Sequence, residues 1–135
     1  MKRKAIGYWV TTGAFAALML LSAALYLTGA PEIRDTLLRL GYPAYLLTIL
    51  GTAKLIGAVA LLQPRFARLR EWAYAGFTIN LIGATASHLF AGDPAAAALA
   101  PAAFILPLAL SYALRPDVAP AGHSGVRQPV RRYAA

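Results

Sequence analysis

The chain contains no cysteine, few acidic side chains and only two histidines. Without cysteine, disulfide bonds, thiol redox chemistry and cysteine metal ligands are all excluded. Two histidines do not make a metal cluster. Neither a nucleophile–base triad nor a glycine-rich phosphate loop can be recognised. The sequence therefore offers no familiar catalytic or metal-binding motif.

The sequence contains four long apolar stretches that have almost no charged residues. Apolar residues make up 59% of the 135 residues, and the mean hydropathy is +0.58, which is typical of an integral membrane protein. A spanning helix needs roughly 20 mostly apolar residues. We predict an all-α membrane four-helix bundle over residues 1–114, with helices at residues 6–29, 44–63, 72–91 and 95–114.

The basic residues are distributed unevenly between the two ends of these helices. Ten lie at the N-terminus, between the second and third stretches, or in the tail, whereas the opposite side has only Arg34 and Arg39. The positive-inside rule then places both termini in the cytoplasm. This placement explains the net charge of +8 better than nucleic-acid binding does. A cleavable signal peptide is the alternative for the first stretch, although its apolar run exceeds the usual ~7–15 residues.

Two segments lie outside the predicted spans. Residues 30–41 have proline in the first turn, glycine at the end and leucines at helical spacing, so we predict a short amphipathic helix in the first outer loop. It is either a connector or a lid over a cavity. Residues 115–135 are basic and rich in Pro and Gly, which predicts a disordered cytoplasmic tail in which His123 has no role.

Lys54 is the charge that interrupts the second apolar stretch. A charge at the bilayer centre costs at least ~2.5 kcal/mol, so an intramembrane lysine indicates a functional site by default. Side chains lean toward the N-terminus of their own helix, and the second and third helices run in opposite directions. We therefore expect Lys54 and a neutral His88 within direct or water-bridged hydrogen-bond reach. Tyr26 would join them, and Asn80 is a second-choice partner.

The third stretch carries small residues at spacings of 3, 4, 3 and 4: Ala73, Gly76, Asn80, Gly83 and Ser87. Such a stripe lets helices approach closely, so we predict that it faces the bundle interior. Asn80 is then either interhelical hydrogen-bonding glue or a ligand group.

Residues at the start of the third stretch and the aromatic residues have structural interpretations. Glu71 is expected to complement the start of its helix and to pair with Arg68. Trp72, Trp9 and Tyr8 are expected to be anchors at the membrane interface, which is also the structural alternative for Tyr26. A capping or snorkelling role is the alternative for His88.

Three segments, "LGYPAYLLTILGTAKLIGAVALL", "EWAYAGF" and "IGATASHLFAGD", resemble the DoxX-like family of small bacterial membrane proteins. The resemblance implies a four-helix membrane bundle. The wider DoxX group is linked to quinone-coupled sulfur oxidation and to membrane complexes that counter oxidative stress. Relatives often carry an acid where this chain has Asn80, which argues against a proton relay through that position.

Three functions follow as hypotheses. The first is a redox-associated membrane subunit whose outer-half cavity, lined by Lys54, His88, Asn80 and Tyr26, holds a quinone-like head group. The second is a non-catalytic binding or assembly module in which the same residues only lock the bundle. The third is a small carrier for an organic anion or lipid, with Lys54 as counter-charge. The expected partners are the lipid bilayer and a membrane redox protein or a second copy of the chain, with no metal.

Overall fold

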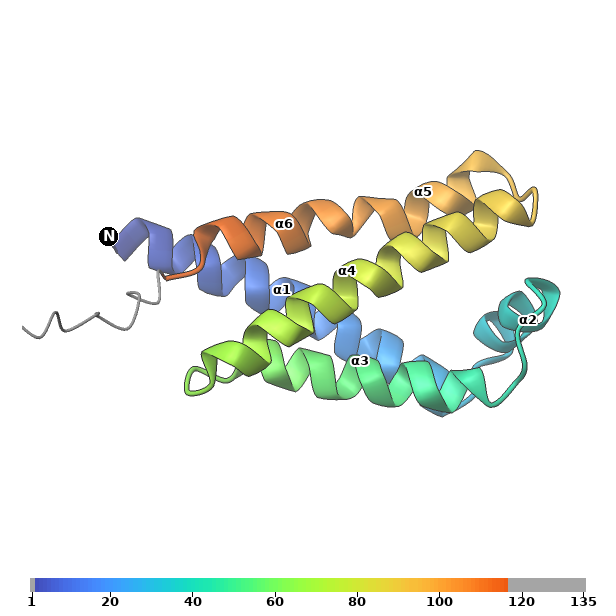
Figure 1. Cartoon of the computed structure of the whole chain (residues 1–135), viewed down its shortest axis with the longest axis horizontal. Helices are drawn as coiled ribbons and strands as arrows, with labels where there is room; N and C mark the ends of the chain where they lie inside the picture. The colour runs from blue at the N-terminus through green and yellow to red at the C-terminus, as the bar shows by residue number, and fades with distance from the viewer. Residues whose placement is uncertain (1, 117–135) are drawn as a thin grey trace, which may run out of the picture.

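The computed structural model describes residues 2–116, and these form helices without any strand (Figure 1). The helices are α1 (Lys2–Leu27), α2 (Pro31–Arg39), α3 (Leu46–Leu62), α4 (Ala67–Phe90), α5 (Ala95–Ala103) and α6 (Ile105–Leu114). The short helix expected over residues 30–41 is α2. Most of the predicted tail, with His123, lies outside the described residues.

Helix α4 runs diagonally through the molecule (Figure 1). It packs against α3 near its own start and against α5 near its end, whereas α1 packs against both α3 and α6. Helices α3 and α4 therefore separate toward the end of the molecule where α2 lies (Figure 1). This divergence opens the space that contains the candidate site.

The helix expected over residues 95–114 is interrupted at Phe104. Pro107 has no N–H to donate, and its ring clashes with the carbonyl of Ala103, four residues earlier. At Phe104 the N–H donates to the carbonyl of Pro101, three residues earlier, at 3.2 Å, where an α-helix would use the carbonyl four residues earlier. The helix resumes at Ile105. The break is thus a consequence of proline spacing.

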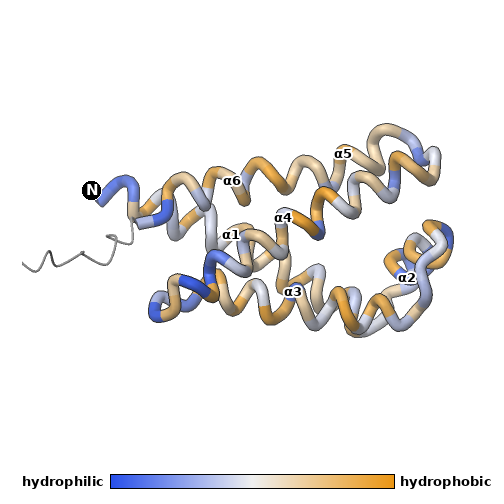
Figure 2. Tube along the Cα trace, viewed as in Figure 1, coloured by the Kyte–Doolittle hydropathy of each residue, from blue (hydrophilic) through white to orange (hydrophobic). Residues whose placement is uncertain are grey.

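Residues in the middle of the helices are mostly hydrophobic, and hydrophilic residues gather toward the two ends of the molecule (Figure 2). Helix α1 and the segment Ala95–Leu114 are each long and apolar enough to cross a membrane, and α3 is apolar but shorter. Large apolar side chains point outward, among them Val10 (64% exposed), Ile79 (72%) and Phe90 (92%). An apolar surface of this extent indicates contact with lipid.

The core lies between α1, α3, α4 and α6. The rings of Phe15 and Phe77 meet edge to face, with centroids 5.2 Å apart. The remaining members of the core cluster are small or aliphatic, apart from one tyrosine: Ala16, Met19, Ala58, Ala60, Leu61, Ala73, Tyr74, Leu81 and Leu108. Gly51 of α3 lets α1 approach closely, since a Cβ there would lie 2.8 Å from Leu27 Cγ.

The small residues of α4 do not have the role expected of them. A Cβ on Gly76 or Gly83 would meet nothing within 4 Å, so no neighbouring helix packs there. The buried face of α4 is instead formed by Arg70, Ala73, Tyr74, Phe77 and Leu81. The prediction of close helix approach along the stripe is wrong because α4 diverges from α3, which leaves both glycines facing open space.

Glu71 and Tyr8 also differ from expectation. Helix α4 begins at Ala67, so Glu71 lies beyond its first turn, and its carboxylate pairs with Arg115 at 3.0 Å rather than with Arg68. It also accepts a hydrogen bond from the Tyr112 hydroxyl at 3.2 Å. Tyr8 is fully buried and therefore not an interface anchor.

A buried hydroxyl cluster of Thr12, Tyr74 and Ser111 joins α1, α4 and α6. Ser111 Oγ lies 2.5 Å from Thr12 Oγ1 and 2.7 Å from the Tyr74 hydroxyl, and both Thr12 and Ser111 are fully buried. No pattern in the sequence predicts this cluster, because each member is a single mildly polar residue within an apolar run.

Replacing Ser111 by Ala should destabilise the protein by about 1–2 kcal/mol, because the Thr12 and Tyr74 hydroxyls lose a buried partner. Unfolding in mixed micelles measures this change. Thr28→Ala is the matched control and should have little effect, because the exposed Thr28 hydroxyl, just past the end of α1, bonds only to carbonyls in the last turn of α1. Equal stability of the two variants would show that the cluster contributes nothing.

Candidate functional site

Lys54 extends from α3 toward α1. Its Nζ donates a hydrogen bond to Ser22 Oγ at 2.9 Å and lies 4.2 Å from the centroid of the Tyr26 ring. The second contact is a cation–π interaction. Within residues 2–116, the ion pairs are Arg39–Asp93, His88–Asp93 and Arg115–Glu71, so no described carboxylate neutralises Lys54. The ammonium is held by a hydroxyl and an aromatic face, and it has donors to spare.

Ser22 is the contact that sequence reasoning missed. It lies four residues before Tyr26, one turn earlier on the same face of α1. Both side chains therefore reach Lys54 from one direction. That spacing was the available signal.

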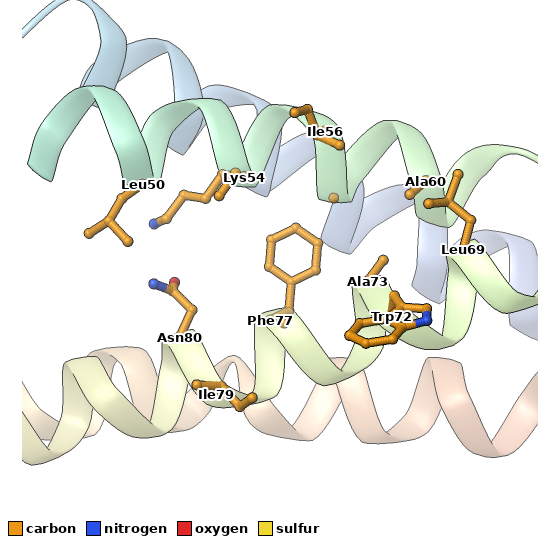
Figure 3. A pocket seen from close by; sticks show the side chains of 13 residues that line it. Leu50, Lys54, Ile56, Ala60, Leu69, Trp72, Ala73, Phe77, Ile79 and Asn80 are labelled. Carbon is orange, nitrogen blue, oxygen red and sulfur yellow. The ribbon is translucent and has the colours of Figure 1, made fainter.

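Two neighbouring cavities meet at Lys54. The larger one, the inner cavity, has a volume of about 620 Å³ and is bounded by side chains of α1 to α5. The smaller one, the α3–α4 groove, has a volume of about 460 Å³. Leu50, Lys54, Ile79 and Asn80 line both. Figure 3 shows Lys54 and Asn80 reaching into the space between α3 and α4 from opposite sides.

The four residues expected to bind a ligand all line the inner cavity: Tyr26, Lys54, Asn80 and His88. Gly83 and Ser87 of the predicted stripe line it as well, whereas Gly76 and Trp72 line the α3–α4 groove. Glu71 lies at neither. Much of the stripe thus forms a cavity wall.

His88 pairs with an acid instead of with Lys54. Its Nδ1 lies 2.6 Å from a carboxylate oxygen of Asp93, in the turn after α4. Among the described residues no direct hydrogen bond joins His88 to Lys54, because Lys54 bonds to Ser22 and an anion is a better partner for histidine than an ammonium group. Both side chains line the inner cavity, and a water-bridged contact between them stays a prediction.

Asp93 also fixes α2. Arg39, the last residue of α2, forms an ion pair with the same carboxylate, and we call Arg39, Asp93 and His88 the α2 latch. Hydrogen bonds from Arg39 and then His88 hold the pKa of Asp93 below its ordinary value of 3.8. Residues of α2, including Thr36 and Leu37, line the inner cavity. The latch therefore holds α2 over that cavity, in the arrangement that a lid would have.

Replacing Asp93 by Asn should loosen α2, because Arg39 loses its ion-pair partner and His88 loses the carboxylate beside its ring. Hydrogen exchange of α2 amides should quicken roughly two- to fivefold, the effect of a partly exposed ion pair. Because the pKa of Asp93 is lower in the folded protein than in the unfolded chain, the latch stabilises the fold fully above pH ~4. This stabilisation is lost as the pH falls through the lowered pKa of Asp93. Acidification should therefore loosen α2 in the wild type but not further in the variant.

Glu32→Gln is the matched control for the latch. Glu32 is an exposed acid of α2 with no ion pair among the described residues. If Asp93→Asn and Glu32→Gln gave the same exchange rates, the latch would have no role in holding α2.

The side chains around Lys54 can donate hydrogen bonds to the oxygen atoms of a ligand, in surroundings that are otherwise apolar. Lys54 and Asn80 supply N–H donors, and Tyr26 supplies an aromatic face. Within the described part of the chain, no three His, Asp or Glu side chains converge as a metal site would require. The site suits the head group of a small organic molecule.

Comparison with known proteins identifies the family. Residues 10–111, which include every helix at the site, match the model of the DoxX-like family. No curated protein and no solved structure matches the chain. The match covers well over half of the chain, and it fits the apolar outer surface. The chain therefore belongs to the DoxX-like family and is a membrane protein.

Proposed function

We propose that this protein binds a quinone-like molecule in the inner cavity and acts as a redox-associated subunit. The observation that carries the proposal is Lys54, a lysine between helices whose described neighbours include a hydroxyl and a ring but no carboxylate. A carbonyl oxygen of a ligand would accept a hydrogen bond from the unused donors of this ammonium. Such a bond would offset part of the desolvation cost.

The size and lining of the inner cavity support the same ligand class. A volume of about 620 Å³ is within the range of sites for small organic molecules. Asn80 can donate to a second oxygen, and the Tyr26 ring offers a face for a flat head group. Most other lining residues are aliphatic, as an apolar ring substituent requires.

His88 gives the proposal a route for protons. Reduction of a bound quinone to a quinol takes up two electrons and two protons. His88 lines the same cavity and is hydrogen-bonded to Asp93, so it can pass protons to the bound quinone from the end of the molecule where α2 lies. The electrons would come from a membrane redox partner. The family resemblance supports a link to quinone chemistry.

We further propose a four-helix bundle in which α1, α3, α4 and the α5–α6 pair cross the inner membrane, with both termini in the cytoplasm. The N-terminus and the α3–α4 turn lie at one end of the molecule, and α2 lies at the other (Figure 1). Most of the described basic residues lie in segments at the first end: Lys2, Arg3, Lys4, Arg65, Arg68, Arg70 and Arg115. Arg34 and Arg39 belong to α2, at the second end. The positive-inside rule gives the orientation.

Cysteine labelling tests this orientation. In intact cells, a membrane-impermeant reagent should label Thr36→Cys and should not label Ser124→Cys. Lysed cells, in which both positions should react, are the control. Labelling of position 124 but not of position 36 in intact cells would reverse the topology.

Solvent extraction tests the ligand. Protein purified in mild detergent should yield a quinone by chromatography and a matching oxidised-minus-reduced optical spectrum. It should also rebind the short-chain quinone 2,3-dimethoxy-5-methyl-1,4-benzoquinone saturably. No extracted quinone and no saturable rebinding would contradict the proposal and leave the non-catalytic assembly module as the better account.

A carrier of organic anions or lipids is the second candidate, favoured by the positive charge of Lys54. The two candidate functions predict different responses to added fatty-acid anions. Fatty-acid anions should displace a carrier's ligand and accumulate in proteoliposomes, whereas a quinone site should retain the quinone when they are added.

A further inference from the structure

We infer that the ligand of the inner cavity has an apolar tail, and that this tail lies in the α3–α4 groove and reaches the lipid between the two helices. The inference rests on the proposed function, because it assumes a head group at Lys54. It adds the ligand's second part, the surface that holds it and the route by which it arrives.

The two cavities adjoin at the residues that would bind the head group. Lys54 and Asn80 line both, together with Leu50 and Ile79. A molecule whose oxygens bond to Lys54 and Asn80 therefore has the inner cavity on one side and the groove on the other. A tail attached to this head group can leave through the groove without displacing a helix.

The groove is apolar beyond this junction. Its lining along α3 includes Ile56 and Ala60, and its lining along α4 includes Trp72 and Phe77 (Figure 3). Among the lining residues, only Lys54 has a charged side chain and only Asn80 has an amide side chain. Both lie at the end of the groove that adjoins the inner cavity. The other end is thus suited to a hydrocarbon chain and unsuited to a polar ligand.

The side of the groove is open and its floor is closed. Trp72 and Ile79 are 77% and 72% exposed, so the rim of the groove faces the surroundings. The floor is formed by Phe77, whose ring would lie 2.8 Å from a Cβ on Gly57. Gly76 has nothing within 4 Å of its Cβ position. A tail in this groove has protein on one side and lipid on the other.

The open space at Gly76 provides a blocking variant that leaves the packed core intact. Gly76→Phe should fill the groove and exclude a tail. Because the hydrocarbon tail is surrounded by apolar groups in lipid as well, the expected effect is steric exclusion, with no loss of hydrophobic driving force. Ala53→Phe blocks the same groove from α3, since Ala53 is exposed and lines it.

The test uses two quinones with one head group, the tail-free 2,3-dimethoxy-5-methyl-1,4-benzoquinone and its decyl derivative. The full chain is placed in phosphatidylcholine nanodiscs with Trp9→Phe, which leaves Trp72 as the one tryptophan of its two. Quenching of Trp72 fluorescence gives each Kd. We expect Gly76→Phe and Ala53→Phe to raise the Kd of the decyl quinone about tenfold or more, with the tail-free Kd within about twofold.

Gly13→Phe is the matched control, because a Cβ on Gly13 also meets nothing within 4 Å and Gly13 lines neither cavity. It should change neither Kd. Equal Kd values for the decyl quinone in wild type and both blocking variants would overturn the groove inference alone, as expected if a lipid chain or a partner helix occupies it. Failure of the wild type to bind either quinone would overturn the proposed function, and the inference with it.

Discussion

Replacing Lys54 by Met should weaken quinone binding strongly, raising the Kd by roughly 10- to 100-fold, while the protein still inserts and folds. Methionine keeps most of the volume of lysine and removes its charge. The ligand then loses a charge-assisted hydrogen bond, worth about 1.5–3 kcal/mol, in a setting that water does not compensate. Stability should stay the same or rise, since a costly buried charge is gone.

The measurement is a titration of each variant with the tail-free quinone, together with unfolding in mixed micelles. Lys54→Arg is the matched control, because it keeps the charge and should bind more tightly than Lys54→Met. Ser22→Ala should have a smaller effect, since it removes only the internal partner of Lys54. If Lys54→Met bound quinone as the wild type does, Lys54 would have a purely structural role.

Gly51→Leu should destabilise the protein by about 1–3 kcal/mol, the usual cost of overpacking. A Cβ at position 51 would lie 2.8 Å from Leu27 Cγ and 3.0 Å from Tyr26 Cβ. The second atom is close to the backbone of α1 and cannot swing aside, so α1 and α3 must separate. Because Tyr26 lies against Lys54, the same change should also weaken quinone binding.

Gly76→Ala is the control for Gly51→Leu. Its new methyl group meets open space, and alanine is a better helix former than glycine by about 1 kcal/mol. It should therefore leave stability unchanged or raise it. Steric trapping or micelle unfolding of both variants gives the comparison. A Gly51→Leu protein as stable as Gly76→Ala would show that α1 and α3 are not closely packed at this position.

Periodicity and composition predicted the all-helical fold, and the residues that carry the resemblance predicted the family. Helical spacing and the lean of side chains were also enough to direct Lys54 and Tyr26 toward the same region. These inferences depend on geometry within a single helix, which sequence specifies directly.

Inferences that depend on the distance between helices failed. The spacing of Gly76 and Gly83 shows that they share a face of α4, but it does not reveal that α3 has diverged from that face. Likewise, the pairing of His88 with Asp93 depends on the conformation of the turn after α4, which brings a carboxylate five residues along the chain back to the ring. The break at Phe104 was not predicted either, although Pro101 and Pro107, which lie on either side of it, are visible in the sequence.

The most direct test of a Lys54-centred ligand site is photolabelling with an azido-benzoquinone in membranes. After digestion, mass spectrometry should find the label on α1, α3 and α4 near Ser22, Lys54 and Asn80. Excess unmodified quinone should prevent the labelling, and Lys54→Met should lose it. Label confined to other parts of the chain, or label that excess quinone does not displace, would contradict a quinone site at Lys54.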